Sequence, residues 1–205
     1  MSSAAPVRPV LCLASVSPRR RELLQQIGVP HLTAVPDIDE TALAGESSAP
    51  GYVVRIACAK ASVIAARGGD LPVLAADTIV VLDGRLCGKP ADAQEGIDML
   101  RRLSGRTHEV LTAVALADRA CVAHRLSTSE VRLRELSLAE CRAYWESGEP
   151  RDKAGGYAIQ GRGAVFIEHL SGSYSGVMGL PLFETAQLLA AAGVPYWPEA
   201  GGSAR

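Results

Sequence analysis

One stretch decides the fold: Val10-Leu11-Cys12-Leu13-Ala14-Ser15-Val16-Ser17-Pro18-Arg19-Arg20. Its apolar first half is typical of a buried strand, and the pattern from Glu22 to Gly28 is helical. Ser17 suits a helix N-cap, Pro18 suits the first helical position, and Gly28 suits the left-handed stop at the far end. The sequence therefore predicts a strand, a short polar turn and a helix.

The polar turn concentrates positive charge at a helix N-terminus. Amides in the first turn of a helix have no intrahelical partners and carry the positive end of the macrodipole. Arg19 and Arg20 add donors and charge at the same place. We therefore expect the turn to bind phosphate, although a basic first turn is also compatible with a face that only meets water.

The composition is typical of a soluble α/β protein with a single domain. Of 205 residues, 48% are hydrophobic and 21% are charged. The formal net charge of -1 predicts no general attraction to polyanions, so we expect no nucleic acid polymer as a partner. No stretch is long enough to cross a bilayer, and Met1 to Pro6 lacks the features of a signal peptide. We expect a cytoplasmic protein without a membrane partner, whose five cysteines are reduced core residues.

Capping, turn and periodicity signals predict the remaining elements. Helices are expected over Pro50–Arg67, with Ser47 or Ser48 as cap, over Asp92–Gly105 and Ser137–Glu149, which begin with capping boxes, and over Leu182–Ala192. Strands are expected over Val73–Leu82 and Arg85–Gly88, joined by a tight turn, as two antiparallel strands within Thr107–Arg134, and over Val165–Ile167. Strands and helices alternate but include hairpins, which predicts a mixed sheet.

Two groups of carboxylates are candidates for chemistry. Asp77 lies in the middle of an apolar strand, where an ionised carboxylate is costly unless a metal, a cation or neighbouring amides compensate it. The acidic turn Asp37-Ile38-Asp39-Glu40 has oxygen ligands suited to Mg²⁺ or Mn²⁺, although such turns are often only solvated. No His or Cys spacing typical of zinc accompanies them.

Four further segments carry polar groups of interest. Lys60 has apolar helical neighbours, so its charge is expected to point into a cleft. Gly84–Pro90 is close to a phosphate-binding P-loop but lacks its spacing and its Ser or Thr, which leaves Lys89 as a possible phosphate contact. Gly172–Gly176 lacks the central serine of a nucleophile elbow. Gln160, in a glycine-rich segment, can donate and accept hydrogen bonds, as reading a pyrimidine edge requires, but an ordinary turn is the alternative.

Taken together, these segments resemble the Maf family of nucleoside triphosphate pyrophosphatases from about Val10 to Gly193. The matching pieces are Ser15–Arg20, Asp39-Glu40, Lys60-Ala61, Ala76-Asp77-Thr78, Gly88-Lys89-Pro90, Leu103-Ser104-Gly105, Thr107–Val110, Asp152–Gly161 and Gly179–Leu182. The segment Asp152–Gly161 is similar to the branch of the family that acts on dTTP and UTP, and differs from the branch that acts on 7-methyl-GTP.

The resemblance implies a fold and a reaction. The fold is a single Maf/ITPase-like α/β domain over residues 1–205, an elongated mixed β-sheet flanked by helices, with two lobes, a central cleft and flexible ends. The reaction is hydrolysis of a nucleoside triphosphate between the α and β phosphorus atoms, giving a monophosphate and pyrophosphate, with Mg²⁺ or Mn²⁺. A homodimer is also expected.

The resemblance also implies roles for single residues. Asp77 is implied as the proton acceptor, and Arg19, Thr78 and Gln160 as the residues that set substrate choice. The implied phosphate-binding residues are Ser15, Arg19, Arg20, Lys60 and Lys89, and the implied metal ligands are Glu40 and Asp77.

Two alternatives stay open at this point. One is a pyrophosphatase for 7-methyl-GTP or for a broad set of modified nucleotides. The other is a nucleotide-binding regulator of cell division that hydrolyses nothing. A substrate panel distinguishes all three.

Overall fold

A computed structural model describes residues 8–43, 46, 48–118 and 121–197. Within them, one mixed seven-stranded sheet has the order β2-β1-β3-β5-β6-β7, and β4 pairs with β3 outside this path. The strands are β1 Leu11–Ala14, β2 His31–Ala34, β3 Val73–Leu82, β4 Arg85–Cys87, β5 Thr107–Asp118, β6 Cys121–Leu133 and β7 Ile167–Ser171. Strand β1 is parallel to β2 and β3, whereas the other pairs are antiparallel. The predicted mixed sheet is confirmed.

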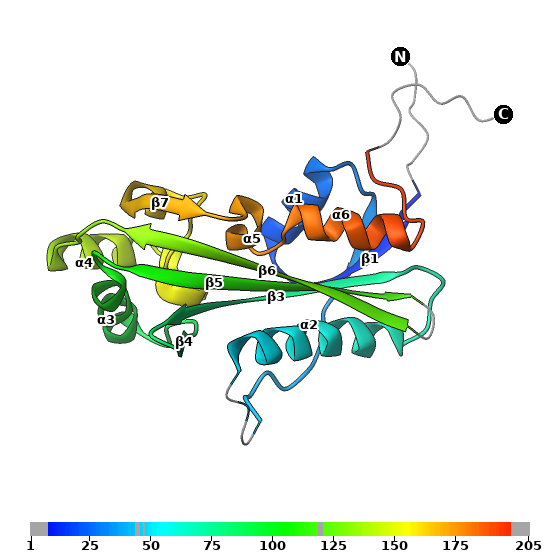
Figure 1. Ribbon diagram of the computed structural model, residues 1–205, viewed down its shortest axis with the longest axis horizontal. Helices are drawn as coiled ribbons and strands as arrows, with labels where there is room; N and C mark the ends of the chain where they lie inside the picture. Colours follow the sequence, from blue (N-terminus) through cyan, green and yellow to red (C-terminus); the bar gives the residue numbers. More distant parts are fainter. Residues whose placement is uncertain (1–7, 44–45, 47, 119–120, 198–205) are drawn as a thin grey trace, which may run out of the picture.

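Helices flank the sheet on both faces. They are α1 Pro18–Gln26, α2 Ala49–Ala65, α3 Ala93–Leu103, α4 Leu138–Glu146, α5 Tyr174–Met178 and α6 Leu182–Ala191, with the 3₁₀ turns η1 Glu149–Asp152, η2 Ala154–Gly156 and η3 Arg162–Phe166. Strands β3, β5 and β6 run along the whole molecule, α2 covers one face, and α1, α5 and α6 gather over the other face at one end (Figure 1). Helices α3 and α4 lie at the opposite end.

Local capping chemistry explains most helix starts. Ser48 accepts a hydrogen bond from the amide of Gly51 at 3.3 Å, as a residue at the expected cap of α2 should. Ser137 and Glu140 form the reciprocal capping box predicted for α4. At α3 the box is incomplete, because the Glu95 carboxylate accepts from the amide of Ala91 and not from that of the N-cap residue.

One expectation about a short element is wrong, and two further short elements were not predicted. The strand expected at Val165 begins at Ile167, because Arg162–Phe166 forms η3 instead. Strand β2 and helix α5, of four and five residues, were not predicted. Such short elements contain too few residues for a hydrophobic period to be visible.

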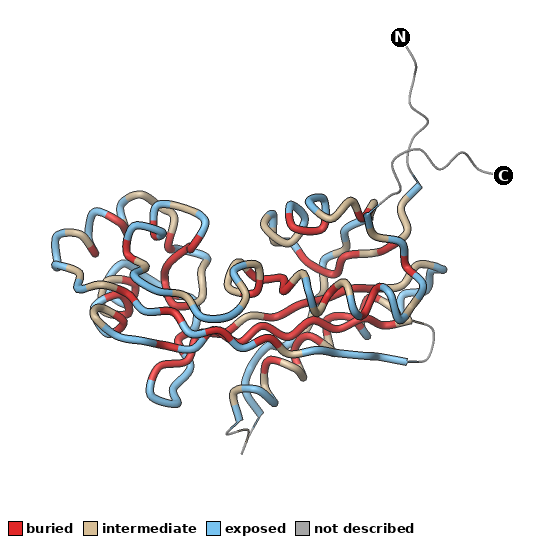
Figure 2. Tube along the Cα trace, turned by 45° about the horizontal axis from the view of Figure 1, so that its top comes forward, coloured by how far each residue is buried: buried red, intermediate tan, exposed pale blue. Residues whose placement is uncertain are grey.

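Side chains of β3 pack in three apolar clusters. On one face Leu74 packs in a cluster with residues of α1 and α6, and Val80 packs in another with residues of α3 and α4. On the opposite face Ile79 packs beneath α2. Because side chains alternate along a strand, Thr78 lies between the first two clusters. Figure 2 shows the buried central strands joining the two ends, so the expected two lobes share one sheet.

One edge of β3 lacks a strand partner over its middle. Strand β1 pairs with β3 only at Val73 and Leu74, and β4 pairs with it only from Val80 onward. Between these points β3 pairs with β5 alone among the described residues. Side chains from both faces of β3, Asp77 and Thr78 among them, therefore border the same opening.

The structure bears on the expectations about the cysteines and the chain ends. All five cysteines are free, and Cys87 and Cys141 are buried, but Cys121 is exposed and is no core residue. The ends expected to be flexible lie largely outside the described residues, at 1–7 and 198–205. Across the described part of the chain, no helix has the length and apolar character needed to span a bilayer.

A buried histidine makes stability depend on pH. His108 is 2% exposed, and one ring nitrogen lies 2.7 Å from the hydroxyl of Tyr157. Burial lowers the pKa of His108 from 6.5 to about 4. Between these values the unfolded chain binds a proton that the folded chain does not, so stability falls as the pH drops. We expect a loss of about 3 kcal/mol across this window.

Urea unfolding at several pH values between 4 and 7 measures this slope in wild type and in His108→Gln. The slope should flatten in His108→Gln and stay unchanged in His169→Gln, whose side chain is exposed on β7. Equal slopes in all three proteins would show that His108 is not responsible.

Candidate active site

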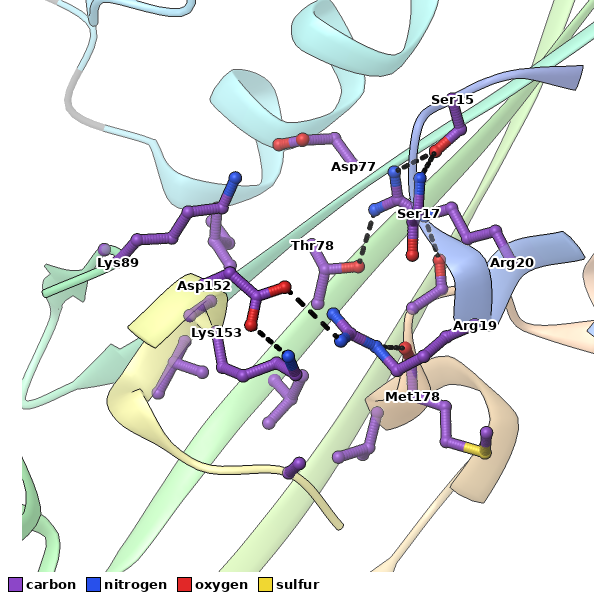
Figure 3. A pocket seen from close by; sticks show the side chains of 18 of the residues that line it. Ser15, Ser17, Arg19, Arg20, Asp77, Thr78, Lys89, Asp152, Lys153 and Met178 are labelled. Carbon is purple, nitrogen blue, oxygen red and sulfur yellow. Dashed lines mark hydrogen bonds and ion pairs between the residues drawn. The ribbon is translucent and has the colours of Figure 1, made fainter. Parts of the chain in front are cut away.

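A cavity of about 500 Å³ lies at the unpaired edge of β3, between the two lobes. It is lined by all the residues to which the family resemblance gives a role: Ser15, Arg19, Arg20, Glu40, Lys60, Asp77, Thr78, Lys89 and Gln160. In Figure 3, Arg19 and Arg20 approach from the α1 side, Asp152 and Lys153 approach from the other lobe, and Thr78 lies between them. The predicted central cleft is therefore present.

Lys60 and two carboxylates form an ionic cluster on the α2 side of the cavity, in which Lys60 and Asp77 are buried and Glu40 is half exposed. Asp77 is 7% exposed, and its Oδ1 lies 2.8 Å from Lys60 Nζ. Glu40 Oε1 lies at the same distance, 2.8 Å, from that nitrogen. The compensating partner that the sequence required for Asp77 is thus an ammonium group, which also contacts a second carboxylate.

Arg20 connects three segments beneath the polar turn. Its guanidinium donates to the carbonyl oxygen of Gly179 at 2.8 Å and to the side-chain oxygens of Ser15 and Thr78, each at 3.4 Å. A guanidinium has five N–H donors, so these three bonds leave two for an anion. Burial lowers the pKa of Arg20, which Asp77 partly offsets.

The start of α1 differs from its expected cap. Ser17 occupies the N-cap position, but its side chain makes no capping hydrogen bond. Instead, the Ser15 hydroxyl accepts from the amide of Ser17 at 3.1 Å. Ser15 therefore organises this turn by binding both its backbone and the Arg20 side chain.

Arg19 reaches across the cavity from the same helix. Its Nε donates to the carbonyl oxygen of Met178 at 3.2 Å, and its Nη1 lies 4.0 Å from Asp152 Oδ2. Asp152 also pairs with Lys153. Burial alone would raise the pKa of Asp152, but Lys153 and Arg19 hold it below its usual value. The two lobes thus meet through charged side chains.

Thr112 does not line the cavity, but it is a buried partner of Thr78 that the sequence interpretation missed. It is the cross-strand partner of Thr78, its hydroxyl lies 3.0 Å from that of Thr78, and it lies 2.7 Å from the carbonyl oxygen of Gly176. Because Thr112 has a single hydroxyl hydrogen, donation to Gly176 leaves Thr78 to donate to Thr112 and to accept from Arg20. A polar residue inside the apolar run of β5 is the signal that could have identified Thr112, as it did Asp77.

Gln160 and Lys89 belong to the other lobe. Both are exposed, and both line the cavity. Neither side chain makes a hydrogen bond within the described part of the chain, so both are available to a ligand. Basic side chains outnumber acidic ones around the cavity: Arg19, Arg20, Lys60, Lys89 and Lys153 against Glu40, Asp77 and Asp152. Such a surface attracts a multiply charged anion.

Asp77 and Glu40 are the residues of the site that could hold a hard divalent cation. Asp77 and Glu40 converge on one positive charge, and Mg²⁺ is commonly held by one or two carboxylates together with substrate phosphates. Over the described residues no group of three or more His, Cys, Asp or Glu is arranged to hold a metal alone. Asp39 lies outside the cavity and accepts a hydrogen bond from the amide of Thr41 at 2.8 Å. Only Glu40 of the acidic turn therefore reaches the site.

Comparison with known proteins identifies the family. The family model described as Maf-like protein matches residues 10–192. The dTTP/UTP pyrophosphatase of Alkalilimnicola ehrlichii is 56% identical over 194 residues, which cover 89% of this chain and 92% of that protein. Proteins of the same name from Saccharophagus degradans and Methylococcus capsulatus are 53% and 55% identical, covering 91% and 87% of this chain and 90% and 89% of their own lengths. The chain therefore belongs to the Maf-like protein family.

Proposed function

We propose that this protein hydrolyses dTTP and UTP to the nucleoside monophosphate and pyrophosphate. The observation that carries the proposal is the buried Asp77 carboxylate at the edge of a cavity rich in basic groups, with Gln160 on the opposite lobe. Relatives that carry this name at 53% to 56% identity support the nucleotide class.

The charges of the cavity suit a triphosphate. A nucleoside triphosphate carries about four negative charges, and Arg groups bind phosphate oxygens in a bidentate manner. The two uncommitted N–H groups of Arg20, with Arg19 and Lys89, would neutralise that charge from both lobes. This arrangement holds the phosphate chain along the open edge of β3.

Asp77 is proposed to remove a proton from water. The water oxygen attacks the α-phosphorus, its proton passes to Asp77, and the bond to the bridging oxygen breaks to release pyrophosphate. Lys60 holds the Asp77 carboxylate in place at 2.8 Å. Glu40 and Asp77 are the residues that would hold Mg²⁺ or Mn²⁺, which would neutralise phosphate charge and make water more acidic. The homodimer and the cytoplasmic location stay predictions.

A substrate panel tests the proposal. The purified protein is incubated with Mn²⁺ or Mg²⁺ and with dTTP, UTP, CTP, 7-methyl-GTP or the purine triphosphates, and the products are resolved by chromatography. We expect dTMP and UMP with pyrophosphate. Nucleoside diphosphate with orthophosphate would indicate cleavage between the β and γ phosphorus atoms. Preferred turnover of 7-methyl-GTP would indicate the other branch of the family. Binding of nucleotide without turnover would indicate a regulator.

Gln160→Ala is expected to reduce the preference for one base over another more than it reduces turnover of the preferred nucleotide. The Gln160 amide offers both a donor and an acceptor to a base edge, so its loss should lower the ratio of kcat/KM for dTTP over dCTP about tenfold. Steady-state kinetics with both nucleotides measures this ratio. An unchanged ratio would remove Gln160 from substrate selection.

A further inference from the structure

The turn that carries Gln160 is held from behind by two side chains. The Tyr144 hydroxyl accepts from the amide of Ala158 at 3.0 Å, just before Gln160. The Glu149 carboxylate accepts from the amides of Arg162 at 2.9 Å and Gly163 at 3.0 Å, just after it. Backbone on both sides of Gln160 is therefore fixed by Tyr144 and Glu149.

These two side chains also bind each other. The Tyr144 hydroxyl donates to Glu149 Oε1 at 2.6 Å. The Tyr144 ring is held edge-to-face against Phe166, with centroids 5.0 Å apart. Neither Tyr144 nor Glu149 is among the residues that line the cavity. They act on the site only through the backbone they hold.

Two glycines that follow Gln160 show how closely the backbone of the turn approaches Tyr144 and Glu149. A Cβ at Gly161 would lie 2.3 Å from Glu149 Oε2, and one at Gly163 would lie 2.6 Å from the Tyr144 hydroxyl oxygen. Both distances are far below van der Waals contact, so only glycine lets the backbone approach so closely. The turn therefore lies directly against Tyr144 and Glu149, and its amide bonds hold it there.

The chemistry of the contacts requires a carboxylate. The Glu149 carboxylate accepts one hydrogen bond from a hydroxyl and two from backbone amides. An ionised carboxylate can only accept hydrogen bonds, so it suits these three donors. Burial alone would raise the pKa of Glu149, but these hydrogen bonds hold it below its usual value. Glu149 also begins η1, which ends at Asp152 in the cavity. One side chain therefore ties together two segments that border the site.

We propose that Glu149, together with Tyr144, is a positioning residue that sets base selectivity by fixing the turn of Gln160. The inference rests on the proposed function, because it assigns a cause to the preference for dTTP and UTP. It predicts that selectivity depends on a carboxylate that touches no substrate.

The test compares Glu149→Gln and Tyr144→Phe with wild type. Both variants keep the side-chain shape and remove part of the hydrogen-bond set. We expect the ratio of kcat/KM for dTTP over dCTP to fall about tenfold in Glu149→Gln, mainly through a higher KM for dTTP, and less in Tyr144→Phe. Melting temperature is measured alongside, and Tyr144→Phe keeps the test informative if Glu149→Gln does not fold.

Glu140→Gln is the matched control. Glu140 is also a hydrogen-bonded glutamate and belongs to the capping box of α4. Its carboxylate accepts a hydrogen bond from the Arg134 guanidinium at 2.7 Å, but it does not touch the Gln160 turn. Its loss should lower the melting temperature and leave the preference ratio unchanged. An equal change in the ratio for Glu140→Gln would attribute the effect to general destabilisation and overturn the inference.

A double variant tests whether Glu149 acts through Gln160. If it does, adding Glu149→Gln to Gln160→Ala lowers the ratio no further. Additive effects, or a folded Glu149→Gln with the wild-type ratio, overturn the inference while leaving the proposed function intact. A wild-type protein that does not prefer dTTP and UTP overturns the proposed function, and this inference with it.

Discussion

Asp77→Asn is expected to lower turnover of dTTP about 100-fold or more while the protein stays folded. The amide has nearly the shape of the carboxylate but cannot take a proton from water. Lys60 keeps Glu40 as a partner at 2.8 Å, so the variant leaves no ammonium uncompensated. Release of pyrophosphate from saturating dTTP measures turnover, and circular dichroism verifies the fold.

Asp83→Asn is the matched control for this variant. Asp83 lies in the turn after the same strand and pairs with Arg106 at 2.6 Å, with both side chains substantially exposed. Its φ of 51° is one that Asn tolerates, and an exposed ion pair contributes little stability. Asp83→Asn should retain wild-type turnover. Near-normal turnover in Asp77→Asn would remove Asp77 from the chemistry.

Arg20→Lys is expected to lower kcat/KM for dTTP about 100-fold, the effect of losing about 3 kcal/mol of charge-assisted contacts. Lysine has the same charge, but one ammonium cannot reach Ser15, Thr78 and Gly179 and also bind a phosphate with two parallel bonds. Kinetics over a range of dTTP concentrations gives kcat and KM separately.

Arg21→Lys tests whether helix α1 tolerates this type of change. Arg21 follows Arg20 directly, is exposed, and does not line the cavity. We expect its replacement to leave kcat/KM within about twofold of wild type. If Arg20→Lys behaves like Arg21→Lys, charge alone is sufficient and the hydrogen-bond geometry of the guanidinium is irrelevant.

The sequence predicted the elements whose signals are local. Pro18 and Gly28 delimit α1, Ser137 with Glu140 starts α4, and the turn at Asp83-Gly84 joins β3 to β4. Each of these depends on a few neighbouring residues, so no knowledge of the tertiary structure was needed.

Long-range geometry could not be predicted from the residues alone. The pattern of β3 indicated that Asp77 needs a partner, but not that Lys60 of α2 supplies it while also holding Glu40. The open edge of β3 results from where β1 stops and β4 begins, and depends on how three segments pair. Glu149 gave no signal, because a carboxylate that binds backbone amides far along the chain resembles any surface glutamate.

The sheet shared by the two lobes also determines how the cavity can move. Hinge motion is usually absorbed by a few loop residues. Here β3, β5 and β6 continue beneath both lobes (Figure 1), so closing the lobes would require bending a stiff hydrogen-bonded ladder. We therefore expect substrate entry to be gated by side chains at the mouth, where Arg19 faces Asp152 across the two lobes. Rearrangement of such side chains takes nanoseconds rather than milliseconds, so product escape need not wait for a domain motion.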